Sequence, residues 1–361
     1  MMRNEEPAVH RPTAVLLTVS GRAEQARESL AGHRPRVDYL EMASKLGFEL
    51  IDEEPSTGLG RFVRSRMPAR RTARHLVLAA RAFRRRKDVS TIVTDAEHTG
   101  LPLALLLRLF GRRGVRHVMI CHVLSTRRKA ALVRRLGLGR TIDHVIVYSS
   151  VQKRLVEELP NIGPGKVSML RFGVDERFYD VGPPVGECHV ISAVGLEGRD
   201  YQTLIEAVAG LPHEVEIAPG SNWATAPRLA VGDLPVNVTV LPHLDADQLR
   251  ELYHRSRFVV VPLQQSDFQA GVTTIVESMS TGRAVIYSRT KGQTDTVIDG
   301  QTGVPVVPGD ADGLRQAMAA LYADVERADR LGRQGRQRIE SEYTLDRYVG
   351  AIGAIVESVS A

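Results

Sequence analysis

The sequence is short of cysteine and of long apolar runs, and each shortage excludes a class of protein. Cys121 and Cys188 are the only cysteines in 361 residues, too few for a disulfide framework, so we expect reduced core thiols in a cytoplasmic protein. The first eleven residues are charged and lack an apolar core, so no signal peptide is predicted. The apolar run Leu101–Phe110 is about half the length that crosses a bilayer and carries Arg108.

Aromatic residues are also scarce, and this argues against a nucleic-acid partner. They make up 5% of the chain, and no basic stretch is interleaved with the aromatic rings on which bases would stack. No cluster of Cys and His offers a transition-metal site either. Two Asp-x-Asp pairs, at 245–247 and 310–312, each begin a predicted helix, where an aspartate caps free N–H groups. We therefore predict helix caps there, no metal site and no cofactor.

What the chain does have is an uneven division of charge. Residues 1–180 hold 33 Lys and Arg against 19 Asp and Glu, whereas residues 181–361 hold 15 against 23. The segment 61–87 contributes eleven basic residues and no acid. Such a basic amphipathic helix can lie on an anionic membrane surface or bind an acidic acceptor, and a core helix with a solvated basic rim is an equal alternative. Its expected apolar stripe consists of Leu76, Val77, Ala80 and Phe83.

Length and pattern predict two α/β domains, each with a doubly wound parallel sheet. A chain of this length exceeds what one core usually fills, and its 43% hydrophobic content is that of a soluble globular protein. We expect a first domain at 1–180, a linker rich in Pro and Gly at 181–187, and a second domain at 188–344. A final helix is expected at 345–361.

The most informative stretch is Val259 to Gly309. A β-branched run ending at Pro262 predicts a buried parallel strand, and a polar loop at 264–270 follows it. Gly271 then opens an amphipathic helix that stops before Gly282, where a second buried strand begins. In such a βαβ unit, ligands bind beyond the carboxyl ends of the strands. The loop and the start of the helix are therefore the candidate binding site.

The residue types at this helix start suit a nucleotide. The amides of Gly271, Val272 and Thr273 are expected to lack intrahelical partners at the positive end of the helix dipole, which favours a diphosphate. Glu277 can accept two hydrogen bonds from vicinal hydroxyls, as a ribose offers. A second arrangement of this type follows the strand at 188–193, where Gly195 forms a turn and Arg199 supplies a cation for a phosphate.

In the first half, polar residues follow three predicted strands on the presumed cleft edge. Gly21, which we place among the donor-binding residues, follows the first strand, and the loop 21–36 is either an acceptor loop or a surface excursion. The loop at 95–100 carries Glu97 and His98, which we place on the acceptor side, and His122 ends the strand at 115–121.

These segments together resemble the signature of the retaining nucleotide-sugar glycosyltransferases of glycosyltransferase family 4, which have the GT-B fold. The matching residues are Glu277, the small-residue turn to Gly282, the strand from Ala284, and the loop from Asp299 to Asp310. The element Gly173-Val174-Asp175 with Phe178 also fits. One departure concerns the first of the family's paired glutamates, whose position is held here by Gln269.

The resemblance implies two Rossmann-like domains facing a cleft, with the final helix crossing back to the first domain. It also implies metal-independent transfer of a sugar, with retention of anomeric configuration, from a donor of the UDP or GDP type. His122 would contact the donor sugar, Arg199 the diphosphate and Gln269 the sugar hydroxyls. Leu244 lies where relatives read the base through backbone groups. The acceptor stays open among a small molecule, a lipid-linked molecule and a glycan, and no oligomeric state is predicted.

Two other interpretations of the same residues remain. An amide is a poor nucleophile and no general base, so Gln269 is also compatible with an inactive partner subunit that binds a nucleotide sugar. A GT-B epimerase would use the same site without an external acceptor.

Overall fold

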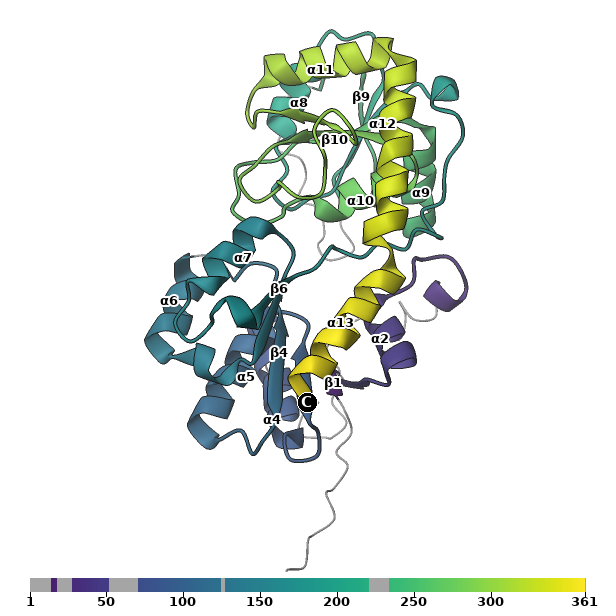
Figure 1. The fold of residues 1–361 in the computed structure, drawn as a ribbon. Helices are drawn as coiled ribbons and strands as arrows, with labels where there is room; N and C mark the ends of the chain where they lie inside the picture. Colours follow the sequence, from purple (N-terminus) through teal and green to yellow (C-terminus); the bar gives the residue numbers. More distant parts are fainter. Residues whose placement is uncertain (1–13, 18–27, 52–70, 125–126, 221–233, 361) are drawn as a thin grey trace, which may run out of the picture.

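The computed structural model of the protein describes residues 14–17, 28–51, 71–124, 127–220 and 234–360. Figure 1 shows two units, one above the other, with a long C-terminal helical segment running from the second unit back along the first. Each unit is built on one six-stranded sheet in which all the strands are parallel. Among the described residues, no helix is long and apolar enough to cross a membrane.

The first sheet has the order β2-β1-β3-β4-β5-β6. Its inner strands are buried on both faces because helices cover both sides of the sheet, which explains their continuous apolar runs. The strands are β1 (Ala14–Leu17), β2 (Glu49–Ile51), β3 (Thr91–Thr94), β4 (Arg116–Ile120), β5 (His144–Val147) and β6 (Val167–Met169). The helices are α2 (Asp38–Leu46), α4 (Arg71–Arg85), α5 (Glu97–Phe110), α6 (Arg127–Leu136) and α7 (Ser150–Glu157).

The second sheet has the order β12-β11-β10-β7-β8-β9, so its strand order reverses between the neighbours β7 and β10. Open α/β sheets bind ligands in the crevice beyond the carboxyl ends of the strands at such a point. The strands are β7 (Val190–Val194), β8 (Val215–Ala218), β9 (Val238–Val240), β10 (Ser256–Val261), β11 (Ala284–Ser288) and β12 (Val304–Val306). The helices are α8 (Tyr201–Val208), α9 (Ala246–Arg255), α10 (Val272–Ser280), α11 (Ala311–Ala323) and α12 (Val325–Arg338).

The last helix, α13 (Leu345–Ser360), packs on the first sheet although the chain reaches it from the second unit (Figure 1). Tyr348, Ile352 and Val356 share a core with residues of α2, β3 and β4. The buried hydroxyls of Tyr148 and Tyr348 lie 2.7 Å apart and form a hydrogen bond. In the segment 181–187, Val185 is buried in the core of the second unit.

Helix α5 differs from the expected pattern. The loop predicted at 95–100 is mostly the first turn of this helix, which begins at Glu97 and holds Pro102 in its interior. The helix was expected to begin at Leu101, where the apolar run starts, and its polar first turn was taken as part of the loop. Helix α6 and strand β12 were not predicted at all. The first is strongly basic with a narrow buried stripe, and the second is a Val-Pro-Val edge strand.

The apolar stripe predicted on α4 is only partly buried, because Ala80 and Phe83 are half-buried at the edge of the core. Leu78, Ala79 and Ala82 are buried in the core, whereas the side chains of Leu76 and Val77 are 53% and 41% exposed. The predicted caps are confirmed, because the side chain of Asp245 accepts from the N–H of Gln248 and that of Asp310 from the N–H of Gly313. Both cysteines are buried and free, as expected of core thiols.

Candidate functional site

Arg199 lies beyond the carboxyl ends of β7 and β10, beside Val194 and Leu263. Its guanidinium is half-buried, and its Nε donates to the carbonyl of Val194 at 2.8 Å. Its Nη1 donates to the carbonyl of Glu197 at 3.0 Å, and its Nη2 donates to Oγ1 of Thr274, on α10, at 2.8 Å. Burial lowers the pKa of Arg199 from its usual value. These three bonds fix the guanidinium and use three of its five N–H donors, so two remain for a ligand.

Gly195 and Gly271 make room for this arginine. Gly195 has φ +104°, and a Cβ there would collide with the Arg199 guanidinium. Gly271 has φ +75°, and a Cβ there would lie 2.8 Å from Cγ1 of Val261 and 3.3 Å from Nη1 of Arg199. Two motifs that were predicted separately, one with Gly195 and Arg199 and the other with Gly271, therefore meet at one point. Neither glycine tolerates a side chain, because both the space and the backbone conformation exclude one.

The helix start offers fewer free amides than predicted. The N–H of Val272 donates to the carbonyl of Gln269 at 3.4 Å, so the expectation that it is open is wrong. For the N–H groups of Gly271 and Thr273, no acceptor is found among the residues that the structure describes. Thr273 is exposed at this end of α10. Two open amides and the helix dipole therefore remain beside Arg199.

Glu277 lies one and a half turns along α10 and is half-buried rather than sealed in the core. Its Oε2 accepts a hydrogen bond of 2.8 Å from the hydroxyl of Tyr253 on α9. Burial raises the pKa of Glu277 to about 7, against the opposing effects of Tyr253, Tyr179 and Arg199. The carboxylate keeps acceptor capacity beyond the Tyr253 bond, as recognition of a diol requires.

Gln269 is buried, with 8% of its surface exposed, in the loop before α10. Its Nε2 donates to Oγ1 of Thr296 at 2.8 Å, and Thr296 donates to Oε1 of Gln293 at 2.9 Å. Gln293 in turn donates to the carbonyl of Ala270 at 2.9 Å. Among the described residues, Oε1 of Gln269 has no partner. An unpaired buried oxygen is costly, and a hydroxyl of a bound ligand would satisfy it.

The loop at 289–299 holds Gln269 in place through Thr296. Gly292 is required there because a Cβ would collide with the carbonyl of Phe268, and its N–H donates to the carbonyl of Ser266 at 2.9 Å. Thr296 and Gln293 were not predicted, because their only signal was a loop rich in Gly, Thr and Asp.

In the first unit, Glu97 and His122 lie together at the carboxyl ends of β3 and β4. Glu97 is buried, accepts from the backbone N–H of His122 at 3.0 Å and pairs with Nζ of Lys129. Burial opposes ionisation of Glu97, but Lys129 outweighs it and lowers the pKa to about 2. Glu97 therefore holds the backbone of His122 in place, and its role toward an acceptor stays a prediction.

The two predicted histidines have different surroundings. The ring of His122 is half-buried against Tyr148, with Nε2 3.2 Å from the carbonyl of Asp95. His98 is exposed and stacks on His75 with ring centroids 5.4 Å apart. Partial burial of the imidazole lowers the pKa of His98.

The remaining predicted positions are peripheral or outside the described chain. Leu244 is half-buried against the core of the second unit, in the loop after β9. Gly21 and the part of the predicted acceptor loop at 21–27 lie outside the described residues, as do 61–70 of the basic segment.

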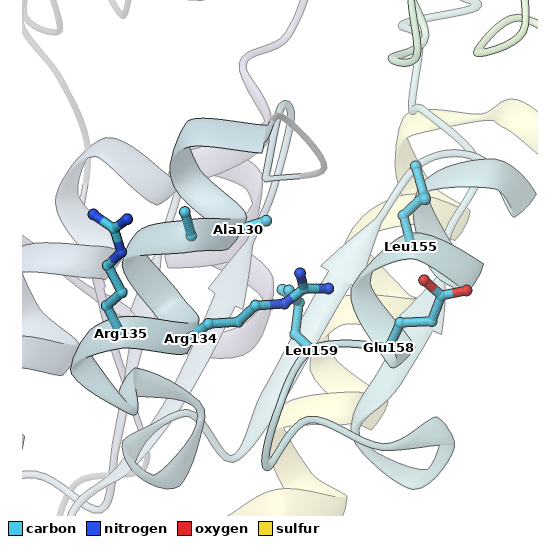
Figure 2. Close-up of a pocket in the computed structure, with 7 residues that line it drawn as sticks. Ala130, Arg134, Arg135, Leu155, Glu158 and Leu159 are labelled. Atoms are coloured by element: carbon cyan, nitrogen blue, oxygen red, sulfur yellow. The ribbon is translucent and has the colours of Figure 1, made fainter.

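A separate pocket of about 350 Å³ lies between α6 and α7, where Arg134 extends toward Leu155 and Glu158 (Figure 2). It contains none of the predicted site residues.

The two halves of the site are connected through α7. Its Gln152 donates from Nε2 to the carbonyl of His122, and its Ser150 donates to the carboxylate of Asp295. Asp295 is followed by Thr296, the partner of Gln269. His122 in the first unit and Gln269 in the second unit are therefore connected by contacts through α7, Asp295 and Thr296.

Comparison with known proteins agrees with this geometry. The family described as Glycosyl transferases group 1 matches residues 230–338, which contain Gln269, Gly271 and Glu277. The glycogen synthase of Mycobacterium tuberculosis (strain H37Rv) is 27% identical over 220 residues, covering 57% of this chain and 52% of that protein. A D-inositol 3-phosphate glycosyltransferase of Segniliparus rotundus is 32% identical over 261 residues, covering 62% and 57%. The chain thus spans little more than half the length of these relatives.

Solved structures show the same fold over the whole chain. Sucrose-phosphate synthase from Thermosynechococcus elongatus has a TM-score of 0.70 at 17% identity and covers 97% of this chain and 99% of its own. HepE of Anabaena, in complex with UDP and glucose, has a TM-score of 0.66 at 14% identity and covers 96% and 100%. The protein has the GT-B fold, as the sequence predicted. Assignment to family 4 within that fold stays a prediction.

Proposed function

We propose that the protein is a glycosyltransferase that moves a sugar from a nucleotide-diphosphate sugar to an acceptor. The observation that supports this best is the contact of Arg199 with Gly195 and Gly271 beyond β7 and β10. The crevice combines a fixed cation, two open amides and, further along α10, a carboxylate suited to a ribose. The names of the relatives, glycogen synthase and glycosyltransferase among them, support the same class of reaction.

In this proposal the second unit stabilises the leaving nucleotide diphosphate. Arg199 and the N–H groups of Gly271 and Thr273 face the charge that develops when the glycosidic bond breaks. Because three protein hydrogen bonds already hold the guanidinium, little reorganisation is needed during the reaction, and this is the main advantage of a preorganised site. Such a site would act without a metal ion.

The donor sugar would lie between Gln269 and His122. Oε1 of Gln269 would accept a hydrogen bond from a sugar hydroxyl, and His122 would contact the sugar from the first unit. An amide cannot form a covalent glycosyl intermediate, so the acceptor would attack from the face that the diphosphate leaves. The proposed outcome is retention of anomeric configuration.

The donor is proposed to be of the UDP or GDP type. UDP has support from HepE, whose structure holds that nucleotide. The proposed acceptor is a small molecule, a lipid-linked molecule or a glycan, and contact of the basic segment 61–87 with the inner face of the cytoplasmic membrane belongs to the same proposal. The alternative of an inactive nucleotide-sugar-binding subunit has one observation in its favour, the amide at Gln269.

A panel of nucleotide sugars tests the proposal. Purified protein is incubated with each UDP- and GDP-sugar, with and without candidate acceptors, and release of the nucleotide is measured. Nucleotide release that depends on the acceptor, and that falls in an Arg199→Ala variant, supports a transferase. Thermal stabilisation by UDP or GDP without turnover of any donor would support the binding subunit instead. Release that needs no acceptor and yields an epimerised or free sugar would support the epimerase.

A further inference from the structure

The first unit carries exposed apolar side chains among arginines at the ends of three helices. Leu109 and Phe110, at the end of α5, are 65% and 63% exposed, which is unusual for large apolar residues beside each other. Exposed apolar residues are also present on α4 and α6. We call this the basic apolar surface; its exposed apolar members are Leu76, Val77, Leu109, Phe110 and Leu136, and Phe83 is half-buried beside them.

Contacts between the helices make this surface continuous. The rings of Phe83 on α4 and Phe110 on α5 lie 6.0 Å apart, and Arg86 covers the ring of Phe83 at 3.7 Å. Arg108 lies beside Gly137, so the end of α5 borders the end of α6. In Figure 1, α4 and α5 occupy the end of the molecule remote from the second unit. The part of this surface around Phe83 and Phe110 is therefore remote from the second unit, whereas Leu76 and Val77 follow His75, which stacks on His98.

The charge of this patch is unbalanced. The sequences of α4 and α6 contain arginines and a lysine but no acidic residue. Arg85 is neutralised by Glu49 and Asp88, whereas Arg84 and Arg108 have no carboxylate partner among the residues that the structure describes. Free arginines around exposed apolar side chains attract an anionic partner that has an apolar layer beneath its charges.

We propose that the basic apolar surface docks the protein on an anionic lipid membrane, with Leu109 and Phe110 inserted below the headgroups. A nucleic acid offers negative charge but no apolar layer for these two side chains. An acidic protein would offer both only through a complementary pocket, whereas a lipid surface needs no matching shape. The proposal assigns a surface and inserted side chains to the membrane contact included in the proposed function, and its test is independent of sugar transfer because docking is measured without a substrate.

Vesicle flotation tests the proposal. The full chain is mixed with vesicles of phosphatidylcholine alone, or of phosphatidylcholine with about one third phosphatidylglycerol, at low ionic strength and at about 0.5 M salt. Binding is expected only to the anionic vesicles and is expected to weaken at high salt. The double variant Arg84→Glu, Arg108→Glu is expected to bind at least about tenfold more weakly. The double variant Leu109→Ser, Phe110→Ser is expected to lose several-fold even at low salt.

Matched changes in the second unit serve as the control. Val307 is 66% exposed and Arg330 is also exposed, so Val307→Ser and Arg330→Glu change the same residue types away from the patch. The control variants are expected to bind as the unchanged protein does, and all variants are compared by thermal melting. The proposal is overturned by equal binding to neutral vesicles, by no binding to anionic vesicles, or by patch variants that bind as the controls do. If the protein does not bind anionic vesicles, an acidic protein becomes the better candidate for the partner.

Discussion

The carboxylate of Asp295 accepts hydrogen bonds from both the backbone N–H and the hydroxyl of Ser150, at 2.9 and 3.1 Å, and thereby joins the two units. The carbonyl of Asp295 is held as well, by Arg171, Arg338 and Tyr343. Because Thr296 follows Asp295 and binds Gln269, this contact also orients the proposed sugar site. The position of the units relative to each other and the geometry of the site are thus linked.

Replacing Asp295 by alanine is expected to reduce turnover. A hydrogen bond to a charged group contributes about 1.5–3 kcal/mol, so losing this contact corresponds to roughly a tenfold fall in kcat if the site depends on it. Steady-state kinetics with the donor found in the panel measures this. Glu357→Ala, which removes an exposed acid from α13, is the control and should leave kcat unchanged. Unchanged kcat in the Asp295→Ala variant would show that the contact does not orient the site.

Gly195 and Gly210 form a matched pair that isolates the contact with Arg199. Both have positive φ, but a Cβ at Gly210 meets nothing within 4 Å, whereas one at Gly195 meets the guanidinium. Alanine at either position is expected to destabilise the protein by about 1 kcal/mol through backbone strain. Only Gly195→Ala is expected to weaken binding of the nucleotide diphosphate, by about tenfold or more, because it displaces Arg199. Calorimetric titration distinguishes the two variants, and equal affinities would contradict the role of Arg199.

The raised pKa of Glu277 predicts a pH dependence of nucleotide binding. With a pKa of about 7, the carboxylate is largely protonated at pH 6 and loses acceptor capacity, so the affinity for a nucleoside diphosphate should rise between pH 6 and 8. Tyr253→Phe removes a hydrogen bond that favours the ionised form, so it should move the midpoint of this rise to higher pH. Glu277→Gln should flatten the dependence. A rise that persists in Glu277→Gln would assign it to another group.

The same shift predicts how stability changes with pH. The folded protein holds the Glu277 proton up to about pH 7, whereas the unfolded chain releases it near 4.5, so the folded state binds more protons between these values. The contribution of Glu277 to the free energy of unfolding therefore decreases as pH rises through this window. Denaturant unfolding of the unchanged protein and of Glu277→Gln should show a difference that grows in favour of the variant from pH 5 to pH 8. A constant difference would contradict the raised pKa.

Variants of Gln269 test the stereochemical part of the proposal. Gln269→Glu keeps the shape of the side chain and should retain substantial activity, whereas Gln269→Ala removes the bond to Thr296 and should lower kcat/KM by about tenfold or more. The anomeric configuration of the product, read by NMR, should be retained in both. An inverted product would refute attack from the face that the diphosphate leaves.

The sequence predicted those parts of the site in which local signals are strong. The β-branched run before Pro262, the glycine at 271 and the turn at Gly282 fixed the strand, helix and strand of the second unit to within two residues. Thr274 and Tyr253 were missed because they act through contacts with Arg199 and Glu277, which are 75 and 24 residues away. Pairings of this kind arise from the sheet order and have no period in the sequence.

The sequence left the environment of α4 open for a related reason. Both possible stripes of this helix are apolar, and the buried one contains Ala79 and Ala82, whose small side chains give a weak signal. The stripe with the larger residues was therefore compatible with a membrane surface and with the core. The structure exposes Leu76 and Val77.

The return of α13 to the first sheet has a consequence for protein engineering. Tyr348, Ile352 and Val356 of α13 complete the core of the first unit. The last strand of that unit ends more than a hundred residues earlier, so the N-terminal lobe is not one continuous segment of the chain. A chimera that exchanges donor specificity by grafting a foreign C-terminal lobe should keep the native tail from Leu345 onward with its own lobe. A graft cut at the linker would remove α13 from the first unit and expose the aromatic residues that α13 covers.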